Sequence, residues 1–289
     1  MLVTLFRLLS ALPLPVLHAI GAMTGWLVYL GSPSYRRRLA ANMRQAGFDG
    51  NLTPAIREAG KNILELPFVW CAAERRVQAS VKVENWDAVQ EALDGGRGVI
   101  FLTPHLGCFE ITAQVVAART PLTAMYRPPR KQALKPLIEG ARARGRLKLA
   151  PATLAGVRTL LKTLRRGEPI GILPDQVPQN GEGVWAPFFG KPAYTMTLPG
   201  KLQQMSGAPV ILTYAERMPR GAGFVVRFAR LQEALGDTAE QQAATINAAM
   251  EALIARCPAQ YFWSYDRYKT PKGVARPAGG GDSGGGQPL

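Results

Sequence analysis

Short apolar runs, each followed by a polar residue or a proline, alternate with helical patterns along most of this 289-residue chain. The runs lie at residues 99–103, 122–126 and 169–173, and two more, PVILTYA and FVVRFA, follow them. Apolar residues at helical spacing separate the runs, for example in residues 154–164. Because strands that alternate with helices pair into a sheet covered by those helices, the pattern predicts a single α/β domain.

Three further helices are expected at residues 36–47, 54–74 and 109–118. Near the C-terminus, Asp237 and Glu240 resemble a capping box, and the helix after them is expected to stop before Pro258. The final segment, PAGGGDSGGGQPL, has too few apolar residues to fold. The α/β domain is therefore assigned to residues 32–273, and residues 274–289 are predicted to be disordered.

Residues 1–31 are predicted to anchor the protein to a membrane. Their 23-residue stretch LLSALPLPVLHAIGAMTGWLVYL is interrupted only by His18, Pro13 and Pro15. About twenty apolar residues suffice to cross a bilayer, but each proline removes a backbone donor. A single span and a short interfacial helix followed by a second helix are therefore equal alternatives. The sequence YRRR follows at once, which favours retention on the cytoplasmic side over a cleaved signal peptide.

The chain has a formal net charge of +15, and its positive charge is concentrated in two regions. The first 48 residues hold five basic residues and no acidic ones, and residues 126–166 hold twelve basic residues against Glu139 alone. Such patches bind phosphate groups of nucleic acid or lipid, or an acidic protein. Only Tyr126 is aromatic in the second region, so the base-stacking pattern of nucleic-acid modules is missing. Nucleic acid is therefore not expected as a partner.

His105 and Glu110 follow the apolar run VIFL within the segment TPHLGCFE. On one helix their side chains would point about 140° apart, so we expect His105 in a turn and Glu110 in the first turn of the next helix. An imidazole bonded to a carboxylate can take a proton from a hydroxyl group. Alternatively, His105 and Glu110 form a buried pair that only stabilises the turn.

Asp175 also follows an apolar run, IGIL. Ligand sites in α/β sheets gather at the carboxyl ends of strands, so Asp175 is a candidate site residue, and a structural turn cap is the alternative.

The three cysteines, Cys71, Cys108 and Cys257, are scattered and odd in number. This argues against a disulfide framework, and the absence of a CxxC pair gives no indication of a metal. Cys108 could act as a nucleophile beside His105, although a small residue in a tight turn explains it equally. A serine nucleophile in a G-x-S-x-G elbow is missing, which disfavours a thioesterase or lipase.

Taken together, these motifs resemble the bacterial lipid A biosynthesis acyltransferase family. His105 and Glu110 match its H-x4-[DE] motif, and further matching blocks follow in order: AMYRPPR, GARARGR, GILPDQ, GVWAPFFGKPAYTMT, GAPVILTYAER and PAQYFWSYDRYKTPKG. PHLGCFE departs from the family where an Asn-His pair and a Ser or Asn are frequent, and YKTPKG lacks the second arginine of the common FKTRP. The likeness covers the chain up to about Gly273.

The resemblance implies a glycerolipid acyltransferase-like fold, with a mixed sheet flanked by helices. It also implies that His105 acts as general base, oriented by Glu110, without metal or cofactor. Arg127, Arg142 and Arg144 would hold substrate phosphates, with Asp175 orienting them. Aromatic residues of the GVWAPFFGKPAYTMT block could line an acyl channel or belong to the core; they are Trp185, Phe188 and Phe189.

The implied acyl donor is acyl carrier protein, and the implied acceptor is a phosphate-bearing lipid of the bacterial inner membrane, a lipid A precursor. Two alternatives remain from the sequence. The acceptor could be a lysophospholipid or another lysolipid. The chain could also be a membrane-tethered protein that only binds anionic lipid, with His105 in a structural role.

Overall fold

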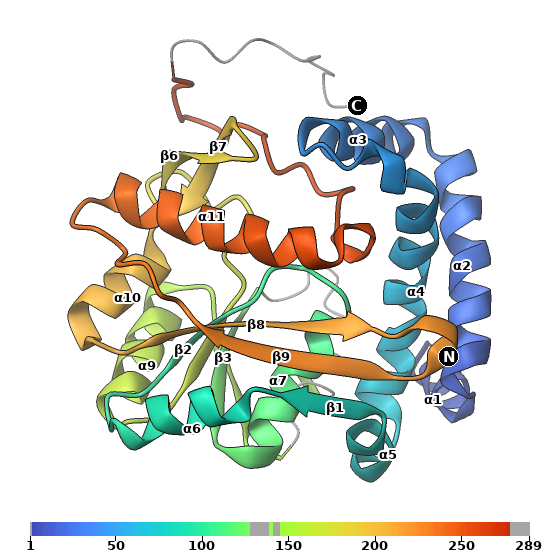
Figure 1. The fold of residues 1–289 in the computed structure, drawn as a ribbon, viewed down its shortest axis with the longest axis horizontal. Helices are drawn as coiled ribbons and strands as arrows, with labels where there is room; N and C mark the ends of the chain where they lie inside the picture. The colour runs from blue at the N-terminus through green and yellow to red at the C-terminus, as the bar shows by residue number, and fades with distance from the viewer. Residues whose placement is uncertain (1, 128–138, 141–144, 278–289) are drawn as a thin grey trace.

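The computed structural model describes residues 2–127, 139–140 and 145–277, and its centre is a seven-stranded sheet (Figure 1). In spatial order the strands are β1 (Val81–Glu84), β9 (Phe224–Arg230), β8 (Val210–Arg217), β2 (Ile100–Leu102), β5 (Ile170–Ile172), β3 (Leu122–Tyr126) and β4 (Leu147–Pro151). The run from β8 to β4 is parallel, β9 is antiparallel to β8, and β1 is parallel to β9. The expected α/β fold with a mixed sheet is confirmed.

Side chains from alternate strand positions enter two separate cores, one on each face of the sheet. In β2, Ile100 and Leu102 pack into one core and Phe101 into the other, as the two-residue period of a strand requires. The first core is covered by α9 (Leu154–Arg165), α10 (Leu198–Ser206) and α11 (Ala239–Arg256). The second is covered by α5 (Glu74–Ala79), α6 (Trp86–Asp94) and α7 (Phe109–Arg119). Strands buried on both faces explain why the runs are continuously apolar.

A short hairpin and the C-terminal helix complete the domain. The hairpin of β6 (Gly183–Phe188) and β7 (Lys191–Met196) packs against α11. At the start of α11 the capping box is formed by Thr238 and Gln241, not by Asp237 and Glu240 as expected. Thr238 is the residue in extended backbone conformation, so its hydroxyl, and not the Asp237 carboxylate, reaches the free backbone N–H groups. Of the predicted disordered tail, residues 278–289 lie outside the described residues.

The N-terminal apolar stretch forms two helices, α1 (Leu2–Ala11) and α2 (Leu14–Gly31), and not one straight helix. Pro13 stands at the N-cap of α2 with extended backbone angles, which fits its missing N–H. Helices α3 (Pro33–Gln45) and α4 (Leu52–Cys71) follow, and α2 and α4 lie side by side at one end of the molecule (Figure 1). The 18-residue α2 is long and apolar enough to cross a membrane.

Glycines allow α2 and α4 to approach with their backbones in contact. A Cβ atom on Gly25 would lie 2.0 Å from the Ile56 carbonyl oxygen, and one on Gly60 would lie 2.0 Å from the Gly21 carbonyl oxygen. Gly21 and Gly25 form a G-x-x-x-G pattern, which permits close helix packing of this kind. The opposite face of α2 stays exposed and apolar, with Met23, Leu27 and Leu30 each more than three-fifths exposed.

A buried ion cluster joins these helices to the sheet. Arg217 at the end of β8 binds Glu65 of α4, with Nη2 2.7 Å from Oε2, and Glu58, with Nη1 2.6 Å from Oε2. His18 of α2 contacts the other Glu65 oxygen at 2.7 Å. Burial alone would raise the pKa of Glu65, but Arg217 and His18 hold this pKa below its ordinary value. Because each charge is paired inside the protein, α2, α4 and β8 are fixed relative to one another.

Gly25→Ala should lower the thermal unfolding midpoint of the protein in detergent micelles. The added methyl group has no room at the α2–α4 contact, and overpacking typically costs about 1–3 kcal/mol. Gly31→Ala in the same helix is the matched control, because a Cβ there meets no atom within 4 Å. Helix propensity alone predicts that both changes stabilise. A midpoint for Gly25→Ala equal to or above that of Gly31→Ala would contradict the described packing.

Candidate active site

Strand register brings His105 and Asp175 together. In the β2–β5 pair Leu102 lies opposite Ile172, and His105 and Asp175 each come three residues later. The Asp175 carboxylate accepts two hydrogen bonds from His105, one from the backbone N–H at 2.9 Å and one from ring Nδ1 at 2.7 Å. The site therefore lies at the carboxyl edge of the parallel strands, where ligand sites of α/β sheets are expected.

The Asp175 carboxylate is 2% exposed, and the hydrogen bonds that it accepts from His105 stabilise its ionised form. Burial alone would raise the pKa of Asp175, but attraction to His105 and the hydrogen bonds from His105 bring that pKa below its ordinary value. An ionised carboxylate only accepts hydrogen bonds, so the proton between the two groups belongs to Nδ1 of the imidazole. Tyr261 also bonds to Asp175, and the pKa of Tyr261 is raised by burial and by this carboxylate.

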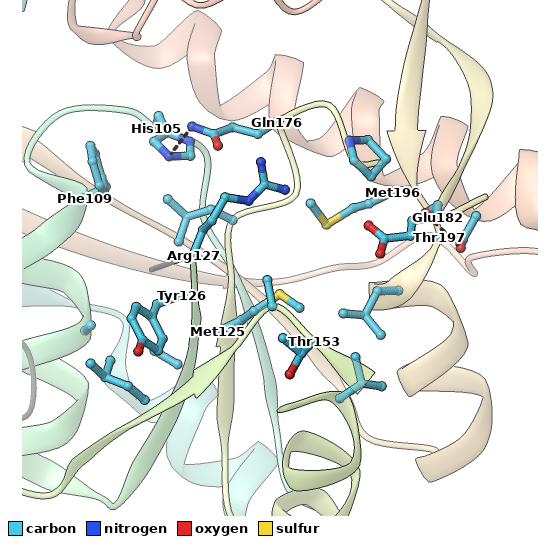
Figure 2. A pocket seen from close by; sticks show the side chains of 18 of the residues that line it. His105, Phe109, Met125, Tyr126, Arg127, Thr153, Gln176, Glu182, Met196 and Thr197 are labelled. Carbon is cyan, nitrogen blue, oxygen red and sulfur yellow. Dashed lines mark hydrogen bonds between the residues drawn. The ribbon is translucent and has the colours of Figure 1, made fainter. Parts of the chain in front are cut away.

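The second ring nitrogen of His105 faces the cavity. The Gln176 side-chain nitrogen lies 3.1 Å from Nε2, in the geometry of an amide donor to a lone pair (Figure 2). With Nδ1 protonated toward Asp175, Nε2 carries the lone pair that can accept a proton. This orientation of His105 is the one that general-base chemistry requires.

Glu110 lies in the first turn of α7, as expected from its spacing. Trp70 of α4 donates its indole N–H to Glu110 Oε2 at 3.1 Å, and Glu110 lines the same cavity as His105. The sequence assigned the orienting carboxylate to Glu110, whereas the contact on Nδ1 comes from Asp175. Asp175, expected from the sequence to orient arginines, thus contacts His105 itself. The role of Glu110 in the reaction stays a prediction.

The turn that carries His105 is tied to β8 and to the C-terminal segment. Cys108 N–H donates to the Ala215 carbonyl at 2.9 Å, and Gly107 N–H donates to the Gln260 carbonyl at 3.0 Å. Gly107 has φ of +58°, and a Cβ there would lie 1.9 Å from the Ala215 oxygen, so only glycine fits. Cys108 is buried, and burial together with Glu65 raises the pKa of its thiol well above the ordinary value. A buried, protonated thiol argues against Cys108 as nucleophile.

A cavity of about 640 Å³ opens in front of His105, and residues from several elements line it (Figure 2). One side is mainly apolar and is lined from α7, β3 and β4 by Phe109, Ala113, Ala124, Leu147 and Leu149. The other side reaches α9, β7 and α10 and is lined by Thr153, Leu154, Val157, Met196, Thr197, Leu198 and Lys201.

Arg127 follows β3 directly and projects its guanidinium into this cavity, toward His105 and Gln176 (Figure 2). Arg142 and Arg144, the other predicted phosphate ligands, lie outside the described residues. Trp185, Phe188 and Phe189 do not line the cavity; Phe188 is a core residue and Phe189 packs against Phe48 and Trp263. For Phe188 and Phe189 the core alternative is therefore observed, whereas Trp185 is half-buried, packs against Tyr194 and donates its indole N–H to the Ala275 carbonyl at 2.9 Å.

Two residues of the site were not assigned from the sequence. Gln176 and Tyr261 belong to the blocks GILPDQ and PAQYFWSYDRY, which carried the family resemblance, but neither had a proposed contact with His105 or Asp175. Among the described residues, no group of three His, Cys, Asp or Glu side chains could hold a metal ion.

The sequence model of the bacterial lipid A biosynthesis acyltransferase family matches residues 1–270. The chain is 27% identical over 272 residues to a lipid A biosynthesis palmitoleoyltransferase of Escherichia coli K12, which covers 90% of this chain and 87% of that protein. It is 27% identical over 224 residues to the lipid A biosynthesis lauroyltransferase of the same organism, in an alignment that covers 76% of this chain and 72% of that protein. It is also 27% identical over 288 residues to a lipid A biosynthesis acyltransferase of Haemophilus influenzae Rd, in an alignment that covers 93% of this chain and 89% of that protein. These matches confirm the resemblance drawn from the motifs: the chain belongs to the bacterial lipid A biosynthesis acyltransferase family.

Proposed function

We propose that this protein transfers a fatty acyl chain from acyl carrier protein to a hydroxyl group of a phosphate-bearing lipid A precursor. The observation that carries the proposal is the Asp175–His105 pair, with His105 Nε2 facing the cavity. The family relationship indicates the reaction class, and the hydrogen bond on Nδ1 supports His105 as the base. The apolar side chains beside α7 suit an acyl chain, and Arg127 and Lys201 of the same cavity suit charged groups.

In the proposed reaction His105 Nε2 takes the proton of the acceptor hydroxyl while that oxygen attacks the thioester carbon. The tetrahedral intermediate carries an oxyanion, and its collapse breaks the carbon–sulfur bond. The thiolate that leaves takes the proton back from the imidazolium. Asp175 stabilises the imidazolium through Nδ1, and Glu110 provides a second negative charge at the wall of the same cavity. General-base catalysis of this kind typically contributes about 10²–10⁴-fold.

Residues 1–31 are proposed to hold the enzyme on the cytoplasmic face of the inner membrane. Exposed apolar side chains cover the outer face of α1 and α2; they are Val3, Leu5, Leu8, Val16, Ile20, Met23, Leu27, Val28 and Leu30. Arg36, Arg37 and Arg38 are exposed at the start of α3, and each can add about 1 kcal/mol of attraction to anionic headgroups. A lipid acceptor stays in the bilayer, so an apolar surface that holds the enzyme at the membrane serves the reaction.

His105→Ala should reduce acyl transfer about 10²–10⁴-fold, measured by mass spectrometry with acyl carrier protein as donor and a lipid A precursor as acceptor. Asp175→Asn should lose a large part of the same factor because the amide no longer fixes the Nδ1 proton. The His105→Ala/Asp175→Asn double variant should be little worse than the worse single variant, since the pair acts as a unit. Cys108→Ala is the control at the same turn and should stay active. Full activity in folded His105→Ala would remove the proposed base.

Glu110→Gln, measured in the same assay, tests the role of the Glu110 carboxylate independently of that of Asp175. Glutamine keeps a hydrogen-bond acceptor for the Trp70 indole, so α7 should stay in place while the charge at the cavity wall is lost. Transfer should fall by at least tenfold if that charge takes part in the reaction. Unchanged kcat and KM would assign Glu110 to holding α7 alone.

Arg127→Ala should raise KM for a phosphorylated acceptor more than it lowers kcat. The guanidinium is exposed to the cavity and suits a phosphate, which it can bind through two parallel hydrogen bonds. Arg127→Lys keeps the positive charge but cannot form two parallel hydrogen bonds to a phosphate, so its KM for the phosphorylated acceptor should lie between those of the wild type and Arg127→Ala. The same two variants are then measured on an acceptor from which the phosphate has been removed. Equal losses on both acceptors would assign Arg127 to a structural role.

Replacing Met23, Leu27 and Leu30 together with glutamine should release part of the protein from lipid vesicles. These side chains are 64–69% exposed, so the change removes apolar surface from the membrane-facing side without disturbing the α2–α4 contact. Transfer to bilayer lipid should fall far more than transfer to the same lipid in detergent micelles. Met205→Gln, at another exposed methionine, is the control and should leave vesicle binding unchanged. Unaltered vesicle binding by the triple variant would place the membrane contact elsewhere.

A further inference from the structure

The outer surface of α9 is a basic stripe. Arg158, Lys162 and Arg165 are exposed and spaced by four and three residues, so they share one face of the helix. Within α9 there is no acidic residue, and among the described residues no carboxylate forms an ion pair with any of the three. The neighbouring Arg166, by contrast, is paired with Glu168 at 2.7 Å. The stripe therefore presents free positive charge to solvent.

The stripe begins at the mouth of the cavity. Leu154 and Val157, in the first turns of α9, line the cavity, and so does Lys201 of the adjacent α10. Leu154 is 67% exposed, and Met205, one turn beyond Lys201, is 61% exposed. This face therefore combines exposed apolar side chains with exposed cations, a composition that an acidic protein can bind.

The position of this surface distinguishes between two anionic partners. An acidic protein and an anionic bilayer would both bind positive charge. However, α9 and α10 lie at one end of the molecule, whereas the apolar face of α1 and α2 lies at the other end of the longest axis (Figure 1). A bilayer that contacts α2 is therefore remote from the basic stripe. The basic stripe is therefore accessible to a partner that binds from solution and delivers a group into the cavity.

We propose that the α9–α10 face, defined by Leu154, Arg158, Lys162, Lys201 and Met205, is the docking site of the acidic protein that carries the acyl thioester. The inference rests on the proposed acyl transfer. Acidic side chains of the carrier would pair with Arg158 and Lys162, and its thioester arm would enter past Leu154 and Lys201 to reach His105. Charge pairs at such a rim mainly raise the association rate and weaken with salt.

The test compares two acyl donors in detergent micelles with the same lipid acceptor: lauroyl acyl carrier protein and lauroyl pantetheine, which has the thioester arm but no protein. Arg158→Glu/Lys162→Glu should lower kcat/KM at least tenfold with the carrier protein and change it less than twofold with lauroyl pantetheine. Neither residue lines the cavity, so the chemistry should be preserved. The salt dependence of kcat/KM with the carrier protein should also flatten. Arg75→Glu/Arg256→Glu carries the same charge change at two exposed sites outside α9 and α10 and should behave as wild type.

Each other outcome has a definite meaning. Equal losses with both donors would show that the two residues shape the cavity, and unchanged values with both would place the docking site elsewhere; either result overturns the inference. Binding of fluorescent carrier protein without an acyl chain, followed by anisotropy, tests docking independently of turnover. Wild-type protein that binds the carrier but transfers from neither donor would contradict the proposed function and not the docking surface. Loss of anionic vesicle binding by the variant, with carrier binding retained, would assign the stripe to the bilayer and overturn the docking proposal.

Discussion

The parallel pairing of β2 with β5 is the constraint on which the site depends. It sets Leu102 opposite Ile172, so the two chains leave the sheet side by side and His105 meets Asp175 three residues later. A shift of one residue in this register would reverse the face of every side chain in β2, taking Ile100 and Leu102 out of their core. Core packing on both faces of the sheet thus maintains the catalytic geometry. The tautomer of His105 follows from the same contact, since Asp175 is buried and ionised.

The turn that carries His105 is connected to the apolar N-terminal helices through hydrogen bonds. Gly107 and Cys108 are hydrogen-bonded to Gln260 and Ala215. The Gln260 side chain in turn bonds both backbone groups of Arg217, at 2.8 and 2.9 Å, and Arg217 is the centre of the buried ion cluster with Glu65. A continuous set of polar contacts therefore runs from α2 and α4 to the turn that carries His105. This arrangement fixes the position of His105 relative to the apolar N-terminal helices, as the proposed membrane-bound acceptor would require.

Local features of the fold followed from the sequence, and long-range pairings did not. The turn at His105 and the start of α7 at Phe109 depend on a few neighbouring residues. For the N-terminal stretch, the prolines left two helices and a single span as equal alternatives, and the structure has two helices. The Asp175–His105 bond joins residues 70 positions apart, and the sequence showed only that both follow strands, not that the strands are neighbours. The Glu65–Arg217 pair spans 152 positions, and no local pattern shows that these two residues are partners. A polar side chain within an apolar helix, such as Glu65 in α4 or His18 in α2, indicates only that a buried partner exists.

His105 Nε2 is proposed to take the proton from the acceptor hydroxyl. A structure of the protein with a lipid A precursor and an acyl donor analogue that cannot react would reveal the distance from His105 Nε2 to the acceptor hydroxyl oxygen. We expect this distance to be about 2.6–3.2 Å, with Asp175 still on Nδ1 and the Gln176 amide displaced from Nε2. An acceptor hydroxyl bound by Glu110, with His105 out of hydrogen-bond reach, would show that His105 is not the base.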